Sequence, residues 1–83
     1  MNVQQEVLSV LDETLSLGGR AMRYSRDTHL LGSVAELDSM AVVTVITSLE
    51  DRFGIVVDDD DIDGDTFATV GSLVDFVSSK VAG

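Results

Sequence analysis

Aspartate side chains at alternate positions are the first residues of this sequence that could do chemistry. Asp59, Asp61 and Asp63, followed by Gly64, reproduce the opening of an EF-hand calcium loop, whose carboxylates supply oxygen ligands at this spacing. The twelfth position of such a loop should be a bidentate Glu, but it is Val70 here. A calcium-binding module stays open as an alternative. We expect instead a solvated acidic turn over residues 58–65, with these three aspartates as candidate ligands only.

A serine at an expected helix start is the second candidate. Ser39 follows Asp38, and a hydroxyl at that point lies beside backbone N–H groups that have no partner within the helix. A phosphate joined to this hydroxyl would sit at the positive end of the helix dipole, so Ser39 suits a phosphodiester anchor. An ordinary helix cap at Asp38 or Ser39 explains the same residues. The anchor requires a hydroxyl that is exposed at the helix start.

Nucleophilic catalysis has little support. No serine stands in a G-x-S-x-G elbow, and the sequence has a single histidine, His29, and no cysteine. We expect His29 to be a solvated or hydrogen-bonded loop residue. The sequence therefore predicts no catalytic residues, and we expect a protein that is not an enzyme.

Charge and length exclude several classes of partner. The 83 residues carry 15 Asp and Glu against 5 Lys and Arg, a formal net charge of −10. Such a surface repels nucleic acid and anionic membranes, and it attracts basic partners. No apolar run approaches the roughly 20 residues that span a bilayer, and no targeting segment is visible. We expect one cytoplasmic domain over residues 1–83, monomeric and not inserted in a membrane.

Hydrophobic periodicity predicts the elements that position these residues. Helical spacing of apolar residues predicts helices over residues 2–17 and 38–53, and a last helix that Thr69 caps. The first helix should have Asn2 as its cap and should stop at Gly18-Gly19. A residue set on these faces should form the core: Val7, Leu11, Val45, Ile46, Leu49, Phe53, Val74 and Val77.

A long connection over residues 18–37 separates the first two helices. It holds three of the arginines, and its leucines should anchor it in the core: Leu30, Leu31 and Leu37. Connections of this length are often functional. Phe67 should anchor an acidic turn or short third helix. Because no pair of strands is evident, a small helical bundle is the simplest way to bury these faces.

The order of these motifs resembles the acyl carrier protein family. The resemblance rests on Leu37-Asp38-Ser39-Met40, on the aliphatic helix that ends in Phe53-Gly54-Ile55, and on the Thr69-Val70 entry to the last helix. It covers nearly the whole chain. The sequence of residues 36–43 is similar to that of specialised bacterial carriers found alongside exosortase and exopolysaccharide systems.

This resemblance implies an all-α four-helix bundle with a long first loop and a short third helix. It implies that a phosphopantetheinyl transferase attaches 4′-phosphopantetheine to Ser39, whose arm then holds acyl groups as thioesters for partner enzymes. The arm supplies the thiol that a chain without cysteine lacks. Aminoacyl and peptidyl carriers use the same kind of arm, so they stay open as alternatives. A plain acidic interaction module, in which Ser39 is only a helix cap, is a further alternative.

The sequence departs from the family where partners dock. Many members have Gly where this chain has Glu36, and acidic residues where it has Ala41 and Thr44. We expect acyl-transferring or synthase enzymes with basic docking patches to contact the second helix through five residues: Asp38, Met40, Val43, Glu50 and Asp51. This departure argues against housekeeping fatty-acid synthesis.

Overall fold

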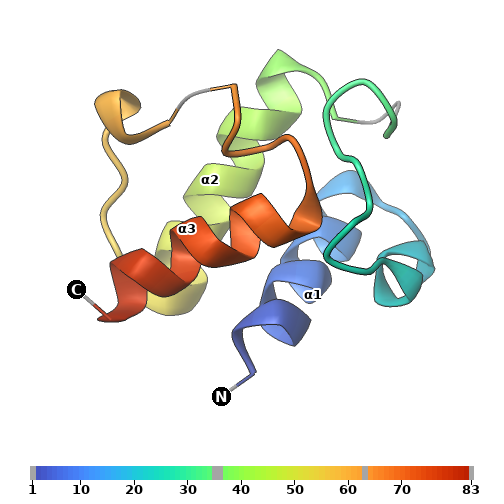
Figure 1. The fold of residues 1–83 in the computed structure, drawn as a ribbon, viewed down its shortest axis with the longest axis horizontal. Helices are drawn as coiled ribbons and strands as arrows, with labels where there is room; N and C mark the ends of the chain where they lie inside the picture. Colours follow the sequence, from blue (N-terminus) through green and yellow to red (C-terminus); the bar gives the residue numbers. More distant parts are fainter. Residues whose placement is uncertain (1, 35–36, 63, 83) are drawn as a thin grey trace.

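Three α-helices and two short 3₁₀ turns make up the part of the chain that the structure describes. The computed structural model describes residues 2–34, 37–62 and 64–82. The elements in chain order are α1 (Val3–Leu15), η1 (Arg20–Arg23), α2 (Ser39–Phe53), η2 (Asp59–Asp61) and α3 (Val70–Ala82). Figure 1 shows the helices gathered around a shared interior. None of the helices within the described ranges is both long enough and apolar enough to cross a membrane.

The predicted helical bundle is confirmed, and it differs from the expectation in its short third helix. The acidic run forms a single 3₁₀ turn, η2, in place of an α-helix. Aspartate side chains compete with the backbone for hydrogen bonds and repel one another, so four in a row disfavour a regular helix. Within the described ranges the bundle therefore has three α-helices.

Side-chain caps set the beginning of the three α-helices within the described ranges, with Asn2 and Thr69 as predicted and Asp38 as one of the two caps considered for the second helix. Asn2 Oδ1 accepts from the Gln5 N–H at 3.1 Å, and Asp38 Oδ1 accepts from the Ala41 N–H at 2.8 Å. Thr69 Oγ1 accepts from the Ser72 N–H while Ser72 Oγ accepts from the Thr69 N–H, which is a reciprocal capping box. The three entry points of the bundle are thus fixed by local sequence.

The end of α1 was predicted two residues too late. Ser16 adopts the left-handed conformation, with φ of 54°, and ends the helix before the glycine pair. Asp12 explains the early stop, because its Oδ2 accepts from the N–H groups of Gly19 and Ala21 at 2.8 and 3.2 Å. This carboxylate draws the chain back over the last turn of the helix.

The interior is aliphatic, and α1 packs against both α2 and α3. Six of the eight predicted core residues are buried; Ile46 and Phe53 pack against the core but are only partly buried. The last helix buries Val70, Leu73, Val74 and Val77, whereas Val81 near its end is exposed. The buried interior includes these residues: Val7, Leu11, Leu15, Val45, Leu49, Phe67, Leu73, Val74 and Val77.

The long connection is fastened to the start of α3. His29 forms an isolated antiparallel bridge with Thr69. Leu30 N–H donates to the Ala68 carbonyl at 2.9 Å, and Val70 N–H donates to the Thr28 carbonyl at 2.9 Å. The expected anchors Leu30 and Leu37 are buried, whereas Leu31 is exposed, contrary to expectation, because the backbone pairing turns it outward.

Candidate functional site

The start of α2 is capped by Asp38, which leaves the neighbouring serine free of that task. Asp38 Oδ1 accepts from the Ala41 N–H, and the Asp38 carbonyl accepts the first helical bond, from the Val42 N–H at 2.9 Å. Asp38 has extended backbone angles, as a cap should. The ordinary-cap explanation therefore fits Asp38 and does not account for Ser39.

Ser39 is the first residue of α2, and its side chain is exposed. No partner for the N–H groups of Ser39 and Met40 is found among the described residues. These two donors lie at the positive end of the helix dipole, where a phosphate group is stabilised. Ser39 is thus an exposed residue at the start of the helix.

An uncharged strip follows Ser39 along the exposed side of α2. We define the α2 strip as Met40, Val43, Thr44 and Thr47, whose spacing of 3, 1 and 3 places them on one helical face. Met40 is 79% exposed and Val43 is 64% exposed. The hydroxyls of Thr44 and Thr47 donate to the carbonyls of Met40 and Val43 at 3.1 and 3.0 Å, so they are satisfied by their own helix.

The acidic residues at the far end of α2 have different surroundings. Asp51 is exposed. Glu50 is half-buried, and its Oε2 accepts from the Val57 N–H at 3.0 Å, which ties it to the segment after the helix. Of the five predicted docking residues, Asp38 and Glu50 therefore have structural partners, while Met40, Val43 and Asp51 project from the surface.

Arg52 belongs to the packing between α1 and α2. Its guanidinium donates to Glu6 at 2.6 Å and to Glu13 at 3.2 Å, both on α1. The hydrogen bond that Arg52 donates to Glu6 raises the pKa of Arg52 above its ordinary value, and the attraction of nearby acidic groups adds to this rise against the opposing effect of burial. Its positive charge is thus turned away from the α2 strip.

One candidate metal ligand of the acidic turn, Asp61, forms an ion pair with a lysine. Asp61 Oδ2 accepts from Lys80 Nζ at 2.7 Å and from the Asp58 N–H at 3.1 Å. The bond from Lys80, and then that from Asp58, lowers the pKa of the Asp61 carboxyl. Asp63 and the Asp59 side chain lie outside the described residues. Among the residues described, no three acidic or histidine side chains gather as metal ligands would.

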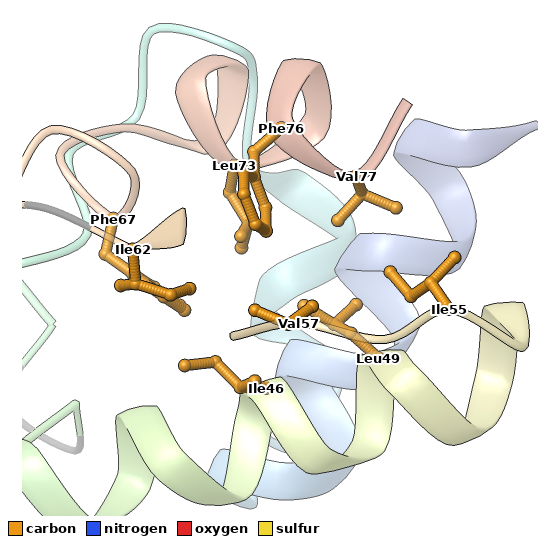
Figure 2. Close-up of a pocket in the computed structure, with 9 residues that line it drawn as sticks. All are labelled: Ile46, Leu49, Ile55, Val57, Ile62, Phe67, Leu73, Phe76 and Val77. Carbon is orange, nitrogen blue, oxygen red and sulfur yellow. The ribbon is translucent and has the colours of Figure 1, made fainter. Parts of the chain in front are cut away.

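An apolar pocket lies between α2 and α3. Figure 2 shows the side chains around this space, which come from α2, from α3 and from the segment that connects these helices. The space is too tightly filled to admit a water molecule. Nine side chains line it: Ile46, Leu49, Ile55, Val57, Ile62, Phe67, Leu73, Phe76 and Val77.

Sequence reasoning did not identify Lys80 or the wall residues outside the predicted core. The structure turns Ile55 and Val57 inward while Val56 points to solvent. All three residues are apolar, so the sequence shows no alternation that could indicate which of them face inward. For Lys80 the sequence holds one weak signal, a cation in the last turn of a helix, where it suits the dipole.

Two comparisons bear on this site. The family model described as phosphopantetheine attachment site matches residues 5–77. The chain is also similar to a holo acyl carrier protein from Nitrosomonas europaea, solved by NMR in solution, with 46% identity over 100% of both chains and a TM-score of 0.92. The two comparisons thus confirm the resemblance to acyl carrier proteins that the sequence showed, and the second also confirms the helical bundle. The chain belongs to the acyl carrier protein family, whose members carry a covalent 4′-phosphopantetheine arm.

Proposed function

We propose that Ser39 is the residue that carries 4′-phosphopantetheine and that the chain presents acyl thioesters to partner enzymes without catalysing their reactions. The observation that carries this proposal is the exposed hydroxyl of Ser39 at the first position of α2, beside a separate cap. The arm supplies a terminal thiol for thioester chemistry, which the protein's own side chains do not provide.

The residues at the helix start fit the phosphodiester of such an arm. Ser39 Oγ would form the bond to phosphorus, and the N–H groups of Ser39 and Met40 favour the resulting negative charge. Asp38 keeps the first turn in place through its hydrogen bond to the Ala41 N–H. The helix start is therefore formed before modification, so little ordering is needed when a transferase engages it.

Mass spectrometry of the modification tests this proposal. Incubation of the apo protein with coenzyme A and a phosphopantetheinyl transferase should add one phosphopantetheine mass to the wild-type chain and none to Ser39→Ala. Ser33→Ala is the matched control, because Ser33 is also exposed but lies outside a helix start, and it should be modified like the wild type. Wild-type protein that stays unmodified by several transferases, or a modified Ser39→Ala, would overturn the assignment.

We infer that partner enzymes approach this arm over the α2 strip. Met40 and Val43 lie within the first turn and a half after Ser39, so any enzyme acting at the arm's origin passes over them. Asp38 and Asp51 place negative charge at the two ends of the strip, which suits a partner with an apolar centre and basic flanks. Glu50 contributes less, because Val57 occupies one of its oxygens.

Kinetics with the transferase test this docking surface. Val43→Lys should raise the transferase KM about tenfold with little change in kcat, because burying a lysine against an apolar patch is costly. Val56→Lys is the matched control, since Val56 is 74% exposed but lies after α2. Equal effects of the two substitutions would refute the surface while leaving the Ser39 assignment intact. Asp51→Ala should raise KM at low salt only, as expected for a screened contact with a basic partner.

A further inference from the structure

The segment after α2 forms one wall of the apolar pocket. We define the strap as residues 55–62, which follow the Gly54 cap of α2 and include η2. Its three inward side chains, Ile55, Val57 and Ile62, meet residues of both α2 and α3 (Figure 2). Access to the space between these two helices from this side therefore requires the strap to move.

The strap is held to α2 by backbone and side-chain bonds. Ile55 N–H donates to the Glu50 carbonyl at 3.1 Å, as the end of the helix requires, and Val57 N–H donates to Glu50 Oε2 at 3.0 Å. Both bonds lie near the first residues of the strap. They fix its root, while its later part, around η2, depends on contacts with α3.

An ion pair joins this later part to α3. Lys80 Nζ lies 2.7 Å from Asp61 Oδ2, and both side chains are about one-third exposed. The same oxygen accepts from the Asp58 N–H, so the ion pair also braces the η2 turn. Lys80 Nζ lies 5.9 Å from the centre of the Phe76 ring, which is itself part of the pocket wall. The lysine thus spans from the pocket to the strap.

We propose that the Lys80–Asp61 ion pair is a latch that holds the strap over the apolar pocket, and that its release opens the interior to a hydrocarbon chain. The closed pocket has no room for water, so an apolar guest enters only after the strap moves. The identity of the guest, the acyl chain on the arm, rests on the proposed function. The latch itself does not, because it is formed by the chain without its arm.

Hydrogen exchange of the apo protein tests the latch residue by residue. Lys80→Met removes the charge and keeps an apolar stem over Phe76, and Lys80→Arg keeps the charge. Arg52→Met is the matched control, because it removes a similarly exposed ion pair between α1 and α2 that does not touch the strap. The two reporters are the amides of Asp61, which donates to the Asp58 carbonyl within η2, and Leu11, in the core of α1.

The expected result is selective opening of the strap. Lys80→Met should speed exchange at Asp61 about threefold, the size that a partly exposed ion pair supports, and leave Leu11 unchanged. Binding of Nile red, a neutral apolar dye, should increase in parallel, while Lys80→Arg and Arg52→Met should behave like the wild type at Asp61. An unchanged Asp61 rate in Lys80→Met would overturn the latch, as would an equal rise at Leu11 or the same rise in Arg52→Met. None of these readouts involves Ser39, so a failed modification test leaves them standing.

Discussion

Replacing Gly71 with alanine should loosen the contact that fastens the long connection to α3. A methyl group at Gly71 would lie 3.0 Å from the Arg26 carbonyl oxygen and 3.3 Å from Arg26 Cβ. The carbonyl cannot retreat freely, because it accepts from the Gly71 N–H at 2.9 Å, and Val70 bonds to Thr28 beside it. The backbone must therefore shift to admit the methyl group.

The size of the effect follows from two opposing terms. Inserting a methyl group into a closely packed site costs about 1–3 kcal/mol. Alanine also favours the helical state over glycine by up to about 1 kcal/mol. The net loss of unfolding free energy is therefore about 0–3 kcal/mol, and its midpoint of about 1.5 kcal/mol lowers the Tm of a domain of this size by about 6–12 °C.

Thermal unfolding followed by far-ultraviolet circular dichroism measures this loss. Gly64→Ala is the matched control, because a methyl group there meets no atom within 4 Å, and it should stay within about 0.5 kcal/mol of the wild type. If Gly71→Ala has the same Tm as the control, the backbone of the long connection shifts at Arg26 with little cost in free energy. The reasoning that Gly71 is required by close backbone approach would then be refuted.

Three further perturbations test other parts of the fold. Leu30→Ala should lower the free energy of unfolding in urea by about 2–4 kcal/mol, because Leu30 is fully buried and anchors the long connection. Asp38→Ala should lose about 1 kcal/mol in the same assay through the missing cap, while Asp51→Ala should be near neutral. The lowered pKa of Asp61 means that its stabilisation is complete above the ordinary aspartate pKa of about 3.9 and is lost as the pH falls through the lower folded value. The stability difference between the wild type and Asp61→Asn should thus be constant from pH 7 to pH 5 and shrink below about pH 4, and a difference that shrinks above pH 5 would contradict this sign.

Local sequence was sufficient for the helices and for the candidate anchor. The caps at Asn2, Asp38 and Thr69 depend on side chains three residues or fewer from the bonds they make, so the pattern alone predicts them. The position of Ser39 at a helix start follows from the same information. Val7 and Leu11 are also buried as their spacing predicts.

Contacts between segments that are distant in the chain could not be predicted from the sequence. The pairing of His29 with Thr69 joins residues 40 apart, and it reverses the expected direction of Leu31. Ile46 is only partly buried, and it lines the apolar pocket together with strap residues whose inward direction no helical period could indicate. The tertiary fold brings Lys80 to Asp61. The sequence could not predict this pair, because a lysine has many possible acidic partners at a separation of 19 residues.

The separation of two roles between adjacent residues explains how a helix start can serve as an attachment point. A serine that caps a helix uses its oxygen to accept a backbone N–H, and modifying that oxygen would compete with the cap. Here Asp38 accepts that bond, so esterification of Ser39 costs the helix no cap. The new phosphate then adds negative charge where the dipole favours it. Asp38→Ala removes this cap and leaves Ser39 as the neighbouring oxygen that can accept the freed N–H. The rate of modification, followed by mass spectrometry, should therefore fall by more than the loss of about 1 kcal/mol in unfolding free energy accounts for.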